Sequence, residues 1–174
     1  PSPAEGNPPP FYQGRLDDPD SSPFNADPDP SKHVLAHVFK IVSDPFVGKL
    51  VVFRVHQRTI RKDTQLSAGD PKRASKIEFD CVLHDSHEED HIHLKPLEFP
   101  QPMQGLAVET QRKADEQRLF DVLHKLEVED PCFKVERHPT TNETVIRGLG
   151  EMHLRAKLAR MSQQYKIELH TKPP

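Results

Sequence analysis

Hydrophobic and polar residues alternate along two neighbouring stretches of the chain, at 33–42 and 49–56. Alternation with a period of two, in runs rich in valine, isoleucine and phenylalanine, is typical of half-buried β-strands. The segment D-P-F-V-G at 44–48 has the chemistry of a turn, because the residue before proline is driven to an extended conformation and glycine tolerates positive φ. The pattern therefore predicts a β-hairpin or a meander, and it predicts short strands at 63–66 and 77–83.

From residue 103 onward, strand and helix periodicities follow one another. Two apolar stripes at helical spacing predict amphipathic helices: Leu119, Val122, Leu123 and Leu126 in the first, and Leu154, Leu158, Met161 and Tyr165 in the second. The expected elements are a strand at 103–109, a helix at 115–130, strands at 133–137 and 143–147, a helix that opens at 148–150, and a strand at 166–170. This β-α-β-β-α-β order predicts an α+β ferredoxin-like domain.

Composition sets the first thirty residues apart from the rest of the 174-residue chain. They hold nine of the eighteen prolines, six acidic residues and one arginine, which gives a net charge of −5. We expect no helix and no central strand there, because proline removes backbone donors and the segment has few apolar groups to bury. The whole chain has a net charge of −3, so the remainder carries +2, too little to indicate binding to free duplex DNA.

Other features exclude further classes of protein. No stretch approaches the ~18–20 apolar residues of a membrane span, and no basic segment followed by an apolar one indicates a signal peptide. Cys81 and Cys132 lie far apart, which is typical of reduced cytosolic thiols, with a disulfide or a reactive thiol as the alternatives. Aromatic residues make up 6% of the chain and tryptophan is absent, whereas stacking platforms for single-stranded nucleic acid need more aromatic residues.

A histidine-rich segment is the candidate for metal chemistry. Histidine and carboxylate are ligands for zinc or nickel, and acidic residues separate the four histidines His84, His87, His91 and His93. Nothing in the spacing fixes a coordination geometry. We therefore expect a solvated polar loop and no built metal site, and a metal-binding module remains the alternative.

The segment G-L-G-E-M-H-L at 148–154 is the candidate for ligand chemistry. The third glycine of a dinucleotide-binding loop is missing, since His153 stands there, and no lysine followed by serine or threonine completes a phosphate loop. We interpret the segment as a tight strand-to-helix turn and expect no cofactor-binding residue. No nucleophile elbow is present, so no catalytic residue is expected. Basic residues on or beside the helices form either a solvated face or contacts to phosphate: Arg112, Lys113, Arg118, Arg155, Lys157 and Arg160.

Segments along the whole chain resemble elongation factor G, in the order that this family has them. They are P-S-P at 1–3 with P-P at 8–9 (exit from the GTP-binding G domain), V-F-K-I at 38–41 and D-P-F-V-G-K-L-V-V-F-R-V at 44–55 (second domain), L-E-F-P-Q-P-M at 97–103 (entry to the third domain), and K-A-D at 113–115, E-D-P-C-F at 129–133 and V-I-R-G-L-G-E-M-H-L at 145–154 (third domain).

The resemblance implies a linker from an absent G domain at 1–31, a translation-factor β-barrel at 32–98 and the ferredoxin-like third domain at 99–174. It implies a monomeric cytoplasmic factor that docks on small-subunit RNA and protein of the ribosome. There it couples GTP hydrolysis to translocation or recycling through its own G domain and C-terminal domains. GTP and magnesium would bind in the parent's G domain, so this fragment is expected to be no enzyme and to hold no cofactor. The candidate contacts to other domains or the ribosome are Arg54, Arg112, Lys113, Gly148, Gly150, Glu151 and His153.

Departures from the family lie mainly in the second domain. The stretch between Asp70 and Phe79 is too short for the usual barrel strands, so residues are expected to be missing near 74–77, and the barrel is expected to be incomplete. The histidine-rich segment and the acidic linker suggest an elongation-factor-G-like paralogue as readily as the main factor. A free-standing RNA-binding ferredoxin-like domain is a further alternative, although Phe133 is the only aromatic residue on its strands at 133–137 and 143–147.

Overall fold

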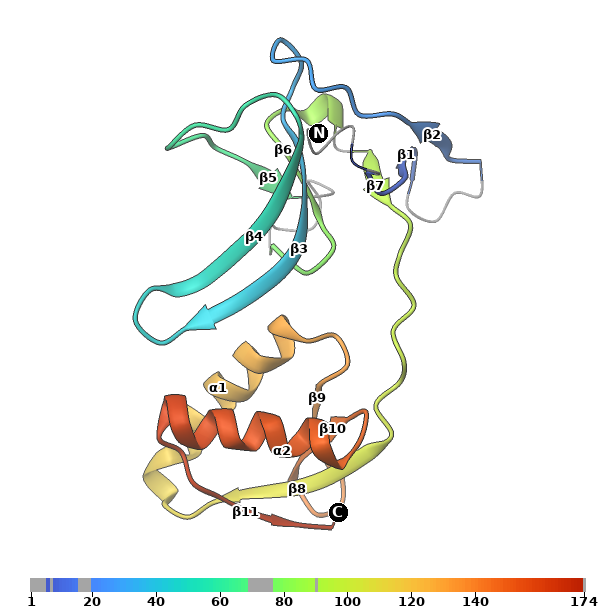
Figure 1. Ribbon diagram of the computed structural model, residues 1–174. Coiled ribbons are helices and arrows are strands. Elements are labelled where there is room, and N and C mark those ends of the chain that lie inside the picture. The colour runs from blue at the N-terminus through green and yellow to red at the C-terminus, as the bar shows by residue number, and fades with distance from the viewer. Residues whose placement is uncertain (1–5, 7, 16–19, 69–76, 90, 174) are drawn as a thin grey trace. The chain divides into compact units, whose positions relative to one another are not determined.

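The computed structural model describes the chain except for residues 1–5, 7, 16–19, 69–76, 90 and 174 (Figure 1). The chain divides into two compact units, each with its own hydrophobic core. Unit 1 comprises residues 1–41 and 51–97, and unit 2 comprises residues 42–50 and 98–174. In the part of the chain that the structure describes, no helix combines the length and the apolar character that crossing a membrane requires.

Unit 1 is built from strands. One sheet has the order β2-β1-β7, and a second has the order β4-β3-β6-β5. The elements are β1 (Phe11–Gln13), β2 (Ser22–Phe24), β3 (Leu35–Asp44), β4 (Gly48–Gln57), β5 (Ser67–Ala68), β6 (Val82–His84), a 3-10 helix η1 (His87–Glu89) and β7 (Ile92–Leu94). The predicted hairpin is confirmed as β3 and β4, and its tip, residues 42–50, belongs to unit 2. Closure of the strands into a barrel stays a prediction, and residues 74–76 of the expected gap lie outside the described residues.

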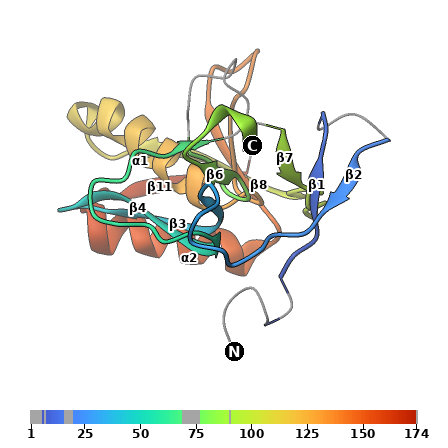
Figure 2. The same cartoon turned by 90° about the horizontal axis from the view of Figure 1, so that it is seen from above.

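The expectation of no central strand in the first thirty residues is wrong at β1. This strand lies in the middle of its sheet, between β2 and β7 (Figures 1 and 2). Phe11 stands opposite Phe24 and Leu94 and is 2% exposed. A single aromatic side chain at the right register supplies the buried apolar area that the average composition of the segment conceals. Pro23 lies on β2, an edge strand, where a missing backbone donor is tolerated.

Two short strand predictions need correction. Residues 63–66 do not form a strand. Asp63 has φ 67°, and the backbone N–H of Thr64 donates to the carbonyl of Arg61 at 3.2 Å, so a turn precedes β5. In the predicted strand at 77–83, Asp80 has φ 64°, in the left-handed region, and interrupts the extended run. The strand is therefore shortened to β6, at Val82–His84, while the backbone of Asp80 and Cys81 still bonds to Val38 on β3.

Unit 2 contains the predicted β-α-β-β-α-β order. Its elements are β8 (Gln104–Thr110), a 3-10 helix η2 (Lys113–Asp115), α1 (Glu116–Glu129), β9 (Lys134–Arg137), β10 (Thr144–Gly148), α2 (Glu151–Arg160), a π-helix η3 (Met161–Tyr165) and β11 (Leu169–Lys172). The sheet has the order β11-β8-β10-β9, with each neighbouring pair antiparallel. Helices α1 and α2 cover the same face of this sheet (Figure 1).

The helical stripes form the core of unit 2. All four apolar residues predicted for the first helix are 3% exposed or less. In the second helix Leu154, Met161 and Tyr165 are buried and Leu158 is half-buried. The wider π-helical turn of η3 extends the stripe to Tyr165, and Lys166, at φ 56°, ends the helix. Phe133 from the loop after α1 fills the space between these side chains and is fully buried.

Candidate functional site

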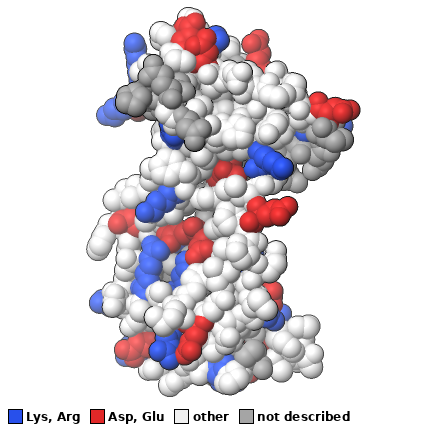
Figure 3. All heavy atoms as spheres, turned by 45° about the vertical axis from the view of Figure 1, so that its right-hand side comes forward, with Lys and Arg blue, Asp and Glu red and all other residues white. Residues whose placement is uncertain are grey.

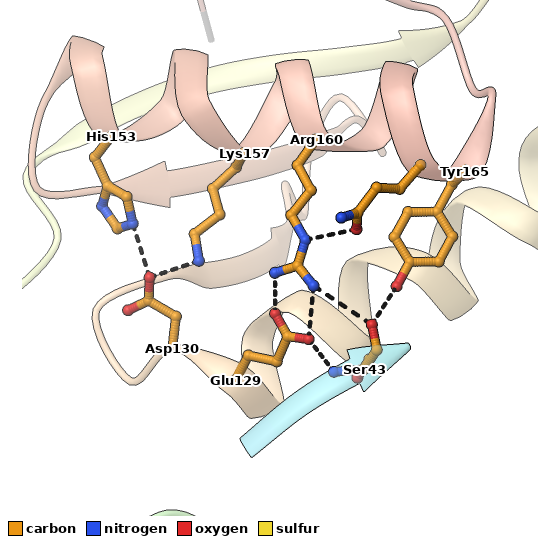
Figure 4. Close-up of polar contacts among 8 residues, drawn as sticks. Ser43, Glu129, Asp130, His153, Lys157, Arg160 and Tyr165 are labelled. Atoms are coloured by element: carbon orange, nitrogen blue, oxygen red, sulfur yellow. Dashed lines mark hydrogen bonds and ion pairs between the residues drawn. The ribbon is translucent and has the colours of Figure 1, made fainter. Parts of the chain in front are cut away.

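Asp130 joins the end of α1 to the first half of α2. One carboxylate oxygen, Oδ2, lies 2.9 Å from His153 Nε2 and 2.6 Å from Lys157 Nζ (Figure 4). The other, Oδ1, accepts the backbone N–H of Cys132 at 2.9 Å. Pro131 ends α1 because it cannot continue the helical hydrogen bonds, and this places Asp130 in an extended conformation at the helix end. We call Asp130, Cys132, His153 and Lys157 the Asp130 cluster.

The hydrogen bonds of His153 define its tautomer. The backbone N–H of Leu149 donates to Nδ1 at 3.1 Å, so Nδ1 carries a lone pair. Nε2 therefore carries the proton and donates it to Asp130. Both ring nitrogens are occupied within unit 2, so this imidazole has no free lone pair with which to act as a general base. Its role in the cluster is to join the turn before α2 to Asp130.

Asp130 remains ionised at neutral pH. Its burial alone would raise the pKa, but the hydrogen bonds from Lys157 and His153 outweigh burial and hold the pKa below its ordinary value. Lys157 is itself well covered, with 13% of its side chain exposed, and its ammonium group lies 5.5 Å from the centre of the Phe133 ring. The cluster is thus a packed set of charges that fixes the loop after α1 against α2.

The two glycines of the turn at 148–150 have different roles. A Cβ atom at Gly148 would lie 2.9 Å from Leu154 Cδ2 and 3.0 Å from His153 Nδ1, closer than packed atoms can approach. A Cβ atom at Gly150 would meet nothing within 4 Å, and its backbone is extended, as any residue allows. Steric need for glycine, which the sequence suggested for the whole turn, is therefore confined to Gly148.

This difference gives a matched pair of substitutions. We expect Gly148→Ala to lower the free energy of unfolding of unit 2 by about 1–3 kcal/mol, because the new Cβ would force the fully buried Leu154 side chain to shift. Gly150→Ala is expected to lower it by only about 0.5–1 kcal/mol, because alanine is a poorer N-cap residue but its Cβ meets no neighbour. Urea unfolding followed by far-ultraviolet circular dichroism measures both. Equal effects at the two positions would contradict the assignment of the close approach to Gly148.

The structure brings together four of the predicted contact residues and separates the other three. Gly148, Gly150, Glu151 and His153 surround the turn before α2, and the exposed Glu151 pairs with Arg155 at 2.5 Å. The other three lie on different elements: Arg54 half-buried on β4, where its Nη2 donates to the carbonyl of Gly6 at 3.2 Å, Arg112 exposed before η2, and Lys113 in η2. Which of the seven contact another domain or the ribosome stays a prediction.

Sequence reasoning missed the acidic partners of the basic residues on α2. Arg155, Lys157 and Arg160 were expected on a solvated face or against phosphate. Arg155 is indeed solvated, whereas Lys157 and Arg160 are largely covered, and all three contact carboxylates: Glu151, Asp130 and Glu129. On the face drawn in Figure 3, described acidic and basic side chains are interspersed rather than gathered into one broad basic patch. The consecutive acids Glu129 and Asp130 at the end of a predicted helix were the available signal, since carboxylates there need cationic partners when they are covered.

The histidine-rich segment is not the solvated loop expected from the sequence. His84 lies on β6 and is 1% exposed, and the ring of His93 on β7 stacks on Tyr12 with centroids 6.2 Å apart. His87 and His91 are exposed. Strand pairing of β7 with β1 orders the segment, which composition alone did not indicate. Among the described residues, no group of three or more histidine, cysteine or acidic side chains has the arrangement of a metal site.

The RNA-binding alternative depended on Phe133 as a stacking surface. Its ring is fully buried in the core of unit 2, so it offers no face to a nucleobase. The described strands β9 and β10 themselves contain no aromatic residue. This observation removes the feature that favoured a free-standing RNA-recognition sheet.

Comparison with known proteins matches this chain to a protein family and to solved structures. The family model for Elongation Factor G, domain III, matches residues 99–173. A crystal structure of a protein from Thermus thermophilus is similar over 82% of this chain, with 26% sequence identity and a TM-score of 0.66. This chain spans 26% of the length of that protein.

Proposed function

We propose that this chain works as part of a translation elongation factor, because the family model for Elongation Factor G, domain III, matches its residues 99–173. In this proposal the fragment docks on the ribosome, on RNA and protein of the small subunit, and couples GTP hydrolysis to translocation or ribosome recycling. Its other partners are the G domain and C-terminal domains of its parent. The proposed factor is a cytoplasmic monomer.

The family match over unit 2 is the observation on which the proposal rests. The strand order β11-β8-β10-β9, with two helices on one face, supports a ferredoxin-like third domain. The strands of unit 1 support a translation-factor β-barrel as its neighbour. The Asp130 cluster supports a coupling role, because a domain that transmits movement between partners needs fixed loops, and this cluster fixes the loop at 130–133 to α2.

The chemistry of GTP hydrolysis belongs to the parent's G domain in this proposal. The 174-residue sequence contains no G-x-x-x-x-G-K-[S/T] segment for binding phosphates. His153, the titratable group at the turn before α2, has both nitrogens engaged. GTP and magnesium would therefore be bound by the G domain, and the residues described here would position domains rather than react.

Ribosome-dependent hydrolysis by the parent protein tests the proposal. We expect the parent to cosediment with ribosomes in the presence of a non-hydrolysable GTP analogue, and ribosomes to stimulate its GTP hydrolysis. A parent carrying Gly148→Ala should lose more of this stimulation than one carrying Gly150→Ala, because only the first disturbs the packing of the turn on α2. A parent whose GTP hydrolysis is indifferent to ribosomes would overturn the translational assignment.

A further inference from the structure

Ser43, at the end of β3 and within unit 2, is held through its main chain by side chains of the same unit. Its backbone N–H donates to Oε1 of Glu129. Its carbonyl oxygen accepts the hydroxyl of Tyr165 at 3.3 Å and Nη2 of Arg160 at 3.4 Å (Figure 4). All three contacts go to main-chain atoms, and none goes to the Ser43 hydroxyl. Ser43 is 7% exposed, so water does not readily replace these partners.

The side chains that receive Ser43 are themselves fixed. The Glu129 carboxylate is 5% exposed and binds Arg160 through both oxygens: Oε2 contacts Nη1, and Oε1 lies 3.0 Å from Nη2. The remaining donor of the guanidinium, Nε, donates to Gln164 at 2.8 Å. A bidentate pair of this kind fixes the orientation of both side chains. The carboxylate and the guanidinium are therefore held in place to bind backbone N–H and carbonyl groups.

The π-helix places the third side chain. Met161–Tyr165 continues α2 as a single wider turn, and Tyr165 at its end is 5% exposed. Burial raises the pKa of the Tyr165 hydroxyl, which therefore remains a donor at neutral pH. Wider helical turns of this type are rare and often lie at functional positions.

We infer that Glu129, Arg160 and Tyr165 form a binding site for the main chain of an extended strand, occupied in this chain by Ser43. The Glu129 carboxylate accepts the backbone N–H of the bound residue, and Arg160 and Tyr165 donate to the backbone carbonyl of the same residue. The partner is thus recognised as β-strand backbone, whatever side chain it bears. We call these three residues the Ser43 site.

Hydrogen bonds next to Ser43 also fix the backbone of the hairpin tip. Asp44 Oδ1 accepts the backbone N–H groups of Phe46 and Val47, both at 2.8 Å, and Gly48 takes φ 93° to reverse the chain. Phe46 and Val47 are 96% and 72% exposed. The Ser43 site therefore holds the base of a turn whose apolar tip projects into solvent.

Amide hydrogen exchange at Ser43, measured by NMR on the full 174-residue chain, tests the inference. In the unmodified chain this amide is expected to exchange about tenfold to a hundredfold more slowly than the same amide would in an unstructured chain, because its acceptor is a buried carboxylate. Ser43→Ala should keep that protection, since the hydroxyl takes no part. Glu129→Gln should remove most of it, because the charged acceptor is lost.

A milder variant and a control complete the design. Tyr165→Phe deletes one hydroxyl from the site and should lower protection at residue 43 about twofold to tenfold with the fold unchanged. Arg155→Ala removes a charge from the same helix without contacting Ser43 and should leave the exchange rate unchanged. Exchange in the unmodified chain at the rate of an unstructured chain, or loss of protection in Ser43→Ala, would overturn main-chain recognition.

Discussion

Replacing Phe133 by alanine is expected to lower the free energy of unfolding of unit 2 by about 3–5 kcal/mol. The ring is fully buried among residues of both helices and the sheet, including Leu123, Leu126 and Ile146. Its removal takes apolar surface out of the core and leaves a cavity, and it also removes the aromatic face beneath Lys157. Urea unfolding followed by the far-ultraviolet helical signal reports this unit, because both described α-helices lie in it.

Phe46 provides the matched control for this substitution. It is the same residue type and is 96% exposed at the hairpin tip, so Phe46→Ala should change the free energy of unfolding by less than about 0.5 kcal/mol. A loss of similar size at both positions would contradict the description of Phe133 as the centre of the core of unit 2.

Unit 1 is expected to lose stability as the pH falls from about 6.5 to about 4. His56 is 2% exposed, and burial, followed by the nearby charges of Arg54 and His37, lowers its pKa to about 4 from an ordinary 6.5. Between these values the unfolded chain binds the proton and the folded chain does not, so acid favours unfolding. The stabilising contribution is complete above pH 6.5, and up to about 3 kcal/mol of it is lost by pH 4.

The surroundings of His56 explain the shift and define the control. Among the described residues, neither nitrogen of the His56 ring has a hydrogen-bond partner. The centre of this ring lies 4.9 Å from the centre of the Phe11 ring and 6.1 Å from that of His37. Burial, partly offset by Asp80, lowers the pKa of His37 too, and burial raises the pKa of Asp80. Comparing the native chain with His56→Phe separates the contribution of His56 to the pH dependence from those of His37 and Asp80. Urea unfolding followed by the amide signals of β3 should show a flatter pH dependence in the variant, and an unchanged profile would contradict this account.

Local periodicity predicted unit 2 well. The stripes on α1 and α2 are confirmed because a helix buries residues three and four positions apart, whichever strand lies beneath it. The predicted neighbouring strands at 133–137 and 143–147 are likewise joined by a local turn: Asn142 takes φ 59°, and the N–H of His138 donates to the carbonyl of Glu143. These features depend on residues close in sequence, so sequence patterns contain them.

Pairing over long distances was not predictable in the same way. β1 joins β7 from the opposite end of unit 1, so neither the short F-Y-Q run nor the histidine-rich segment showed alone that it would be a strand. The same holds for Asp80, whose left-handed backbone interrupts the strand predicted at 77–83. Nothing in the alternation of apolar and polar residues there indicated this turn. Where the partner strand decides the outcome, the period-two pattern is too short to identify it.

The candidate site was predicted in part, for the same reason. The segment at 148–154 identified Gly148 and His153, because both belong to one local turn. Asp130 lies 23 residues from His153, and Glu129 lies 31 residues from Arg160, so their pairing became visible only in the folded chain. The π-helical turn that positions Tyr165 left no mark in the apolar stripe, since the stripe runs through it.

The position of Tyr165 gives the molecule an optical reporter of its own. The chain has no tryptophan and two tyrosines, Tyr12 on β1 and Tyr165 at the Ser43 site. In a Tyr12→Phe background, fluorescence arises from the Tyr165 phenol when it is excited at wavelengths that tyrosine absorbs and phenylalanine does not. Its emission then follows the hydrogen bond to the Ser43 carbonyl in real time, without an attached dye, in the isolated chain or in a longer one that contains no further fluorophore.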